Sequence, residues 1–314
     1  MPPKIAVITG PTATGKTALG VILAQSLNGE VVSADSMQLY KRMDIGTAKV
    51  TPEETRGVPH HMVDVYEPWE SCSVSRYVAD ATACVEDILS RGKLPILVGG
   101  TGLYIDSLIR GLDFADAPGD EGTREALSAR YDEIGGEKFR EELRKVDPPR
   151  AEKLAPGDKR RLVRAMEVYT LTGKTITEHD EETKLRPPKY DAAKIALTFD
   201  DREMLYERID KRVDIMVQSG LVEEVQALLQ SGLERGSTAM QAIGYKEIVS
   251  ALEGEISMPE AIEAIKRESR RYAKRQLTWL RRDESVFWIR WEKKADFDFA
   301  RRVSTEFLYS RGLK

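Results

Sequence analysis

Hydrophobic positions in the first hundred residues come in short blocks, each with the period of a strand or a helix. Residues 4–9 (KIAVIT) form a continuous apolar run that ends at Gly10, as is typical of a strand buried on both faces. The next block repeats leucine every four residues, like one face of a helix. Strands are predicted at 4–9, 30–35 and 94–100, and helices at 16–27 and 75–91, with Gly92 ending the latter. This alternation indicates an α/β fold with a parallel sheet and helices on both faces.

The pattern changes at about residue 113. No strand-like run follows until KIALTF at 194–199, and the intervening segment carries charged helical stretches separated by prolines and glycines. Further helices are predicted at 202–230, 239–252 and about 258–282, the last opened by a Ser257–Glu260 capping box, and a final strand at 286–291. We therefore expect an α/β core, residues 1–112 and 191–314, interrupted by a helical insertion domain at 113–190.

The loop between the first strand and the first helix matches the motif G-x-x-x-x-G-K-[ST], as GPTATGKT. Its glycines let the backbone wrap around an anion, and the N–H groups at the start of a helix attract negative charge. Lys16 adds a positive charge, and the Thr17 hydroxyl can ligate Mg²⁺. A simple strand-to-helix turn is the alternative. The motif predicts a P-loop fold and a diphosphate-bearing ligand; the candidate binding residues are Gly10, Thr12, Ala13, Thr14, Gly15, Lys16 and Thr17.

Two other strands end in polar residues that belong to the same edge of the sheet. Asp35 closes the strand at 30–35, and Thr101 follows the strand at 94–100 in a glycine-rich turn. Because ligands of open parallel sheets bind at the carboxyl ends of the strands, both residues are expected to converge on the P-loop. There a carboxylate can act as general base on an incoming nucleophile, as in small-molecule kinases. The alternatives are a helix N-cap for Asp35 and backbone capping for Thr101.

Composition limits the classes of protein. Of the 314 residues, 41% are hydrophobic and 32% charged, which fits a folded globular chain. No apolar run is long enough for a signal peptide or a membrane span, and the two cysteines cannot form a disulfide framework, so we expect a cytoplasmic protein with no membrane partner.

The net charge of −4 shows no general basic excess, so any surface for nucleic acid must be local. Residues 266–282 hold eight basic side chains and a single acid, Glu268. On a helix they suit contact with a phosphate backbone, although a solvated face is the plain alternative. A second basic cluster, Lys159–Arg164, lies in the insertion and favours nucleic acid.

Taken together, these segments resemble the tRNA dimethylallyltransferases (isopentenyl-tRNA transferases) of bacterial type over nearly the whole chain. The matching blocks are GPTATGKT (10–17), SADSMQLYKRMDIGTAK (33–49), the Pro59–His61 segment, GGTGLY (99–104), KRRLVRAMEVY (159–169), AIGYKE (242–247) and RRYAKRQLTWLRR (270–282). The resemblance implies a kinase-like P-loop core with a helical insertion that grips the tRNA anticodon arm. It also implies transfer of a dimethylallyl group from dimethylallyl diphosphate to the exocyclic N6 amine of the adenosine immediately 3′ of the anticodon, with Mg²⁺ and release of pyrophosphate.

Roles follow from the same resemblance. Asp35 looks like the general base, Thr101 like the donor to the bridging oxygen of the diphosphate, and Lys16 like a charge that stabilises the leaving group. Arg208 or Arg212 would reach the diphosphate. The expected tRNA-binding residues are Asp35, Ser36, Met37, Gln38, Thr101, Arg160, Arg161, Arg164, Gln241, Gly244, Arg270, Arg271 and Lys274.

Two further expectations concern metal and assembly. Thr17 is the proposed metal ligand. A metal at His60 and His61 is not expected, because adjacent side chains diverge and the only other histidine is His179. The chain is expected to act as a monomer. A small-molecule P-loop kinase, an AMP prenyltransferase and a non-catalytic RNA-binding protein are the alternatives. The large insertion and the basic helix argue against the first two, and the intact P-loop with Asp35 argues against the third.

Overall fold

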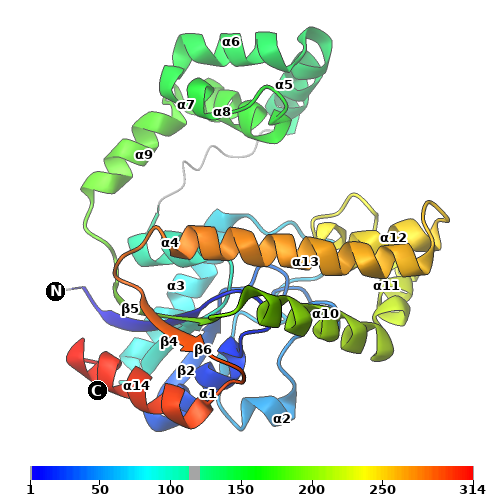
Figure 1. Ribbon diagram of the computed structural model, residues 1–314. Helices are drawn as coiled ribbons and strands as arrows, with labels where there is room; N and C mark the ends of the chain where they lie inside the picture. Colours follow the sequence, from blue (N-terminus) through cyan, green and yellow to red (C-terminus); the bar gives the residue numbers. More distant parts are fainter. Residues whose placement is uncertain (1, 113–120, 314) are drawn as a thin grey trace. The chain divides into compact units, whose positions relative to one another are not determined.

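The computed structural model describes residues 2–112 and 121–313 (Figure 1). The chain divides into two compact units, Met1–Arg110 with Lys189–Lys314, and Gly111–Pro188. Each unit has a hydrophobic core of its own. The second unit spans nearly the same residues as the expected insertion, 113–190; that it grips an RNA arm stays a prediction.

The first unit is built on a parallel sheet of six strands. They are β1 (Lys4–Thr9), β2 (Gly29–Ser33), β3 (His60–His61), β4 (Leu94–Val98), β5 (Asp191–Phe199) and β6 (Phe287–Trp291), in the order β3-β2-β4-β1-β5-β6. Central β1 pairs with β4 and β5, so that Ile8 lies between Val98 and Ile195. The predicted α/β P-loop class is confirmed. Since all strands run the same way, the segments that follow β1, β2 and β4 meet at one edge.

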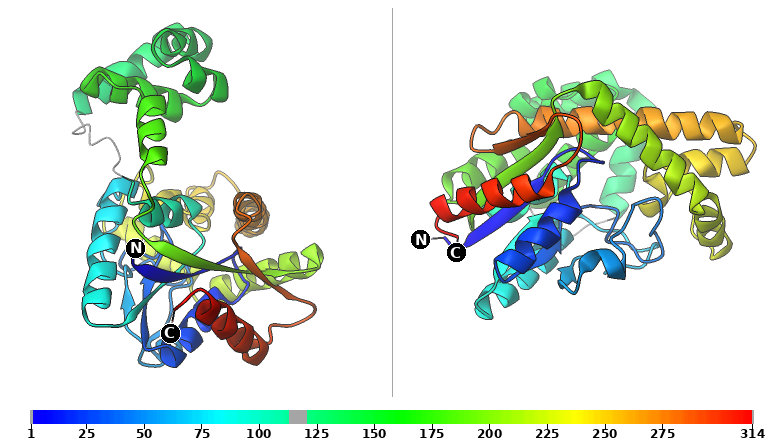
Figure 2. Two further views of the ribbon diagram at one scale, coloured as in Figure 1. Left: turned by 90° about the vertical axis from the view of Figure 1, so that its left-hand side faces the viewer. Right: turned by 60° about the horizontal axis from the view of Figure 1, so that its bottom comes forward.

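Helices cover both faces of this sheet (Figure 2). On one face lie α1 (Lys16–Ser26) and α14 (Phe297–Ser310), side by side. The other face carries α3 (Val74–Ser90), α4 (Gly102–Arg110) and α13 (Met258–Leu280). Along α13 pack α10 (Arg202–Gln218) and α12 (Tyr245–Leu252). The shorter elements are α2 (Pro52–Thr55), α11 (Leu221–Gln230) and η1 (Ala239–Gln241).

Most predicted elements are present, with three differences. The region 202–230 is not continuous, because Gly220 adopts a left-handed conformation (φ +103°) and separates α10 from α11. The region 239–252 divides into η1 and α12. Strand β3 was not predicted, since two residues are too short for a recognisable period. The capping box is confirmed: the Ser257 hydroxyl accepts from the Glu260 N–H while the Glu260 carboxylate accepts from the Ser257 N–H.

The second unit is helical over the residues that the structure describes. It contains α5 (Glu121–Ile134), α6 (Gly136–Val146), α7 (Pro148–Lys153), α8 (Lys159–Thr172) and α9 (Ile176–Leu185). Its core gathers Phe139, Leu143 and Leu162.

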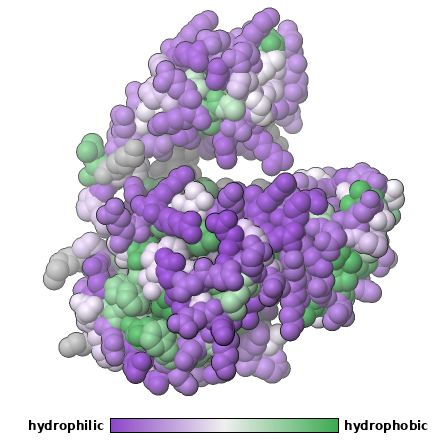
Figure 3. All heavy atoms as spheres, in the orientation of Figure 1, coloured by the Kyte–Doolittle hydropathy of each residue, from purple (hydrophilic) through white to green (hydrophobic). Residues whose placement is uncertain are grey.

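Hydrophilic side chains dominate the face drawn in Figure 3. Within the described ranges, no helix has the length and apolarity needed to cross a membrane.

Candidate active site

The P-loop conformation depends on glycine at two positions. A Cβ atom on Gly10 would lie 2.3 Å from the carbonyl oxygen of Leu197, so only glycine fits beside β5. Gly15, which precedes α1, has a φ of +90°. These two positions turn the chain from β1 into α1 around a narrow loop.

Side chains from distant segments fix this loop. The indole Nε1 of Trp291, at the end of β6, donates to the Thr14 carbonyl oxygen at 3.0 Å, and the buried Thr14 hydroxyl donates to the Pro11 carbonyl oxygen at 2.9 Å. The Thr12 N–H donates to Oε1 of Gln276 at 3.2 Å, so this amide already has a partner. Neither Trp291 nor Gln276 was predicted as part of the site, and no local motif identifies them.

Two cations and one carboxylate lie close together at the loop. Lys16 Nζ donates to the Pro11 carbonyl oxygen at 2.7 Å. Burial and the charge of Arg212 lower the pKa of Lys16 to about 8, and the charge of Asp35 opposes that shift. Burial also lowers the pKa of Arg212. Such an electropositive cluster beside a P-loop suits a diphosphate.

The two arginines of α10 differ in what they contact. Arg208 Nε donates to the Ala13 carbonyl oxygen at 3.1 Å, and its guanidinium lies 5.2 Å from the centre of the Phe199 ring. Within the described part of the chain, the buried Nε of Arg212 has no hydrogen-bond partner. Arg208 therefore supports the loop backbone, whereas Arg212 retains a free donor near Lys16 and Asp35.

Asp35 and Thr101 occupy adjoining loops at the same edge of the sheet. Asp35 Oδ1 accepts from the Met37 N–H at 3.0 Å and caps a turn, whereas the predicted alternative was a helix N-cap. The Thr101 hydroxyl oxygen accepts from the Ser36 N–H at 3.1 Å, and the Thr101 N–H donates to the Ala34 carbonyl oxygen at 3.1 Å. The loops after β2 and β4 are thus joined directly.

The glycine turn before Thr101 packs tightly against neighbouring backbone and α13. A Cβ atom on Gly99 would lie 2.2 Å from the Ala34 carbonyl oxygen. Tyr272 and Gln276 of α13 both donate to the Gly100 carbonyl oxygen, at 3.5 and 3.0 Å. Burial, together with the charge of Asp35, raises the pKa of Tyr272 to about 12.

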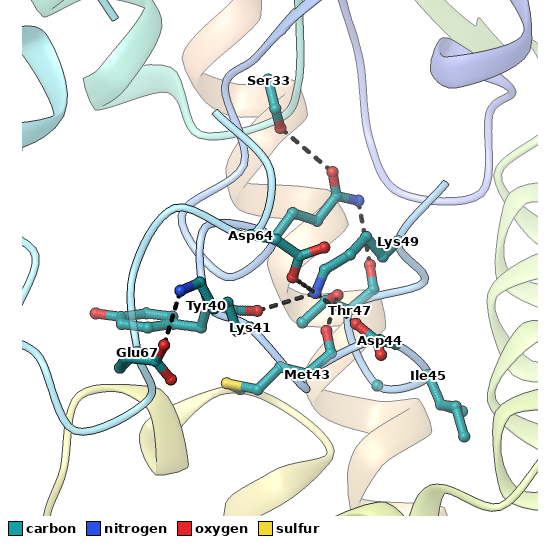
Figure 4. A network of polar contacts seen from close by, with 12 residues as sticks. Ser33, Tyr40, Lys41, Met43, Asp44, Ile45, Thr47, Lys49, Asp64 and Glu67 are labelled. Atoms are coloured by element: carbon teal, nitrogen blue, oxygen red, sulfur yellow. Dashed lines mark hydrogen bonds and ion pairs between the residues drawn. The ribbon is translucent and has the colours of Figure 1, made fainter. Parts of the chain in front are cut away.

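The predicted contact residue Gln38 is held within a polar network. Figure 4 labels its partners Ser33 and Thr47 together with other residues of the loop 40–49. Its amide nitrogen donates to the carbonyl oxygens of Thr47 and Ala48 at 3.3 and 3.4 Å, and its amide oxygen accepts from the Ser33 hydroxyl at 3.3 Å. Lys49 is almost fully buried and donates to the Tyr40 carbonyl oxygen as well as to Asp44 and Asp64. The loop that orients Gln38 is therefore rigidly built.

A carboxylate from α11 completes this loop. Glu224 accepts from the backbone N–H groups of Asp44, Ile45 and Gly46 at 2.8, 2.8 and 3.1 Å, and from the Tyr245 hydroxyl at 2.5 Å. Nothing in the local sequence predicts this pairing, because its two sides lie about 180 residues apart.

The basic residues of α13 fall into two groups. Arg270 and Lys266 form ion pairs with Asp210 and Asp214 of α10, at 2.5 and 2.8 Å. Arg271 is more exposed, and its ion pair among the described residues is with Glu268 of the same helix. Lys274 is also exposed. The free cationic surface is therefore smaller than the charge count suggests.

The remaining predicted contact residues differ in exposure: Arg161 and Gln241 are exposed, Arg164 is half-buried and Gly244 is buried. Arg160 is exposed. In the second unit, Arg161 pairs with Asp158 at 3.4 Å and Arg164 with the buried Glu167 at 2.8 Å. In the first unit, Gln241 Nε2 donates to the Arg235 carbonyl oxygen at 2.9 Å. Gly244 (φ +102°) is the N-cap of α12 and donates its N–H to Glu247 at 2.8 Å.

Metal ligands were expected only at Thr17, which is exposed in the first turn of α1. The imidazole of His61 lies 2.8 Å from Glu30, and that of His60 lies 2.9 Å from the Val58 carbonyl oxygen. Within the described residues, no three His, Cys, Asp or Glu side chains are grouped as a metal site.

Comparison with known proteins gives consistent matches along the chain. The family model described as IPP transferase matches residues 38–283, and one described as isopentenyl transferase matches residues 3–65. A tRNA dimethylallyltransferase of Caldanaerobacter subterraneus subsp. tengcongensis is 50% identical, covering 91% of each chain. One of Geobacillus thermodenitrificans is 49% identical, covering 99% of this chain and 98% of the relative.

Solved structures give matches to the same kind of protein. The tRNA isopentenylpyrophosphate transferase of Bacillus halodurans is 43% identical with a TM-score of 0.73, covering 99% of this chain and 96% of its own. A eukaryotic dimethylallyltransferase described as acting on tRNA is 30% identical with a TM-score of 0.84, covering 98% of this chain and 80% of its own.

Proposed function

Because the chain belongs to the IPP transferase family, we propose that it is a tRNA dimethylallyltransferase. It transfers a dimethylallyl group from dimethylallyl diphosphate to the N6 amine of the adenosine immediately 3′ of the anticodon in tRNA, and it releases pyrophosphate.

The observation that carries this proposal is the grouping of Lys16, Arg212 and Asp35 beside the P-loop. The charges of Arg212 and Asp35 both shift the pKa of Lys16. A site for an anion therefore adjoins a carboxylate that can act as a base. A prenyl transfer to an amine needs both, because one substrate leaves as a diphosphate anion while the other must lose a proton.

Each group has a distinct part in the transfer. The exocyclic amine of adenine is a poor nucleophile that sheds a proton as it bonds to carbon, and the Asp35 carboxylate accepts that proton. An allylic carbon tolerates positive charge, so much of the barrier lies in the charge that develops on the leaving diphosphate. Lys16, Arg212 and the P-loop amides stabilise that charge, and the Thr101 hydroxyl donates to the bridging oxygen. Of the two α10 arginines, Arg212 is the proposed diphosphate contact, since Arg208 already bonds the Ala13 carbonyl oxygen.

A divalent metal, Mg²⁺, suits this site. The exposed Thr17 hydroxyl fits an ion that takes most of its ligands from water and substrate phosphates rather than from a protein cage. When bound, Mg²⁺ would add positive charge next to the diphosphate.

The tRNA contacts are proposed to come from four parts of the chain. Ser36, Met37 and Gln38 would meet the flipped-out adenosine next to Asp35. The exposed Arg271 and Lys274 would contact phosphates, as would arginines of the second unit and the Gln241–Gly244 segment. We also propose that the chain acts as a monomer in the cytoplasm, where its tRNA substrate is found.

The decisive experiment is incubation with labelled dimethylallyl diphosphate and Mg²⁺, together with either unmodified tRNA or AMP. Label is expected in unmodified tRNA. No label is expected in a tRNA in which guanosine replaces the target adenosine. Label in AMP alone would identify a free-nucleotide prenyltransferase and overturn the proposal.

A further inference from the structure

The amide side chain of Gln276 links the two loops on which the proposed reaction depends. Gln276 lies on α13 with only 6% of its surface exposed. Its Oε1 accepts from the Thr12 N–H in the P-loop, and its Nε2 donates to the Gly100 carbonyl oxygen, directly before Thr101. These partners define the orientation of the amide. If the amide were flipped, its NH₂ group would face the Thr12 N–H and its oxygen would face the Gly100 carbonyl oxygen, and neither hydrogen bond could form.

The fit around this amide is tight. A Cβ atom on Gly100 would lie 2.1 Å from Nε2 of Gln276, whereas the next contacts outside that side chain begin at 3.5 Å. Gly100 does not have a positive φ, so alanine is compatible with its backbone. What requires glycine at position 100 is therefore the amide of Gln276.

We infer that Gln276 is a positioning residue that sets the Thr101 hydroxyl relative to the diphosphate held in the P-loop. This role rests on the proposed function. Thr12 belongs to the loop that holds the leaving group, and Thr101 is the donor to its bridging oxygen. A donor of this kind contributes strongly only when it is held within a few tenths of an ångström of the developing charge. Gln276 itself bonds to backbone atoms of both loops and need not touch either substrate.

The same helix presents Arg271 and Lys274 to solvent. One rigid element thus carries both the proposed RNA contacts and the link between the catalytic loops, so docking of RNA on α13 and alignment of Thr101 share a single scaffold.

Two variants that remove the link by different routes test this role. Gln276→Ala deletes the amide, and Gly100→Ala displaces it by steric contact. Each is expected to lower kcat for prenyl transfer about 10- to 100-fold, with the KM for dimethylallyl diphosphate and for tRNA changed less than about threefold. Because both act on one contact, the double variant should be no slower than the slower single variant. Gly236→Ala is the matched control, since no atom lies within 4 Å of its Cβ position and its φ is not positive.

A third variant separates positioning from loss of structure. In Gln276→Glu, a carboxylate can still accept from the Thr12 N–H but donates to the Gly100 carbonyl oxygen only when protonated. The ratio of its kcat to that of the wild type should rise as pH falls from 8 to 5.5, with thermal stability followed in parallel.

The outcomes are distinct. A wild-type chain without transfer to tRNA overturns the proposed function and this role with it. If the wild type is active, three results would each overturn the positioning role alone. These are an unchanged kcat in the single variants, rate losses that multiply in the double variant, and a pH-independent kcat ratio for Gln276→Glu.

Discussion

At the scale of residues, the candidate site groups three charges, and the pKa of Lys16 responds to the other two, Arg212 and Asp35. Burial and the charge of Arg212 lower the pKa of Lys16, and the charge of Asp35 opposes part of that decrease. Each group alone has an ordinary structural explanation. Their combination beside a P-loop is what supports anion binding next to proton transfer.

Replacing Asp35 by asparagine tests the base. Asparagine keeps the side-chain oxygen that accepts from the Met37 N–H, so the turn should survive while the base is lost. We expect kcat to fall by at least about 100-fold, with the Kd for tRNA changed less than about threefold, as measured by single-turnover kinetics and filter binding. A rate within threefold of wild type would remove Asp35 from the mechanism.

The proposed contact of Lys16 with the diphosphate predicts an affinity that depends on pH. A lysine with a pKa of about 8 is mostly charged at pH 7 and mostly neutral at pH 9, and only the charged form attracts the anion. The kcat/KM for dimethylallyl diphosphate should therefore decline above about pH 8. In Lys16→Arg, which stays charged, overall activity should be lower but this decline should disappear. A wild-type profile that is flat to pH 9.5 would contradict the assignment.

At the scale of elements, α13 organises the first unit. Its buried side supplies Gln276 and Tyr272 to the Gly100 carbonyl oxygen, and ion pairs of Arg270 and Lys266 fix it to α10. Its exposed side carries the remaining cations. The basic residues of one helix thus have separate tasks.

This separation predicts different effects on tRNA binding. The double variant Arg271→Ala/Lys274→Ala should weaken binding and reduce the slope of log K against log[salt] by about 1 to 2, because each phosphate contact releases counterions. The control Arg301→Ala/Arg302→Ala removes equal charge from the exposed side of α14 and should leave the slope unchanged. Equal slopes in all three proteins would mean that this face of α13 is merely solvated.

The contact of α11 with the loop 40–49 gives another prediction. Glu224→Ala leaves three backbone N–H groups without their carboxylate, which should loosen the loop that orients Gln38. We expect the KM for tRNA to rise about 10-fold while the Kd for dimethylallyl diphosphate stays within twofold, since the P-loop is untouched. Glu223→Ala, next to it and exposed, is the control. An equal loss of affinity for both substrates would point to general unfolding.

Much of this architecture could be predicted from periodicity and motifs, and its limits have physical causes. The buried apolar runs identified five of the six strands, and the P-loop motif indicated where the candidate anion site lies. The partners of that motif could not be found in the same way. Gln276 and Trp291 reach the loop from more than 260 residues away, and a single glutamine or tryptophan on a helix or strand has no pattern that marks it. The break at Gly220 was also missed, because glycine is compatible with a helix until its φ is known.

At the scale of the whole first unit, function and stability lie in different parts of the sheet. The proposed site occupies the carboxyl ends of the strands. Near the amino end of β2, the carboxylate of Glu30 is 2% exposed and meets Arg91, Lys93 and His61 at 2.5, 2.7 and 2.8 Å. This cluster connects β2 to β3 and to the chain before β4, so it is expected to support folding without affecting the reaction.

The acid stability of the first unit should reveal this cluster. Hydrogen bonds from Arg91 hold the pKa of Glu30 well below its ordinary value of 4.5. A carboxyl group whose pKa is lower in the folded state contributes its full stability above pH 4.5, and that contribution falls as pH decreases toward the folded-state pKa. Glu30→Gln should therefore cost about 2 kcal/mol at pH 7, since the partners are partly exposed, and progressively less below pH 4.5.

All four tryptophans belong to the first unit, so tryptophan fluorescence during urea unfolding measures its stability selectively. Glu255→Gln is the matched control: Arg235 lowers the pKa of Glu255 to about 2, but that pair is exposed and its effect is screened by solvent and salt. A difference between wild type and Glu30→Gln that stays constant from pH 7 to pH 3.5 would contradict the prediction, because below pH 4.5 the unfolded chain takes up a proton at Glu30 that the folded protein does not. Prenyl transfer by Glu30→Gln at pH 7, where the folded state still dominates, should equal that of the wild type.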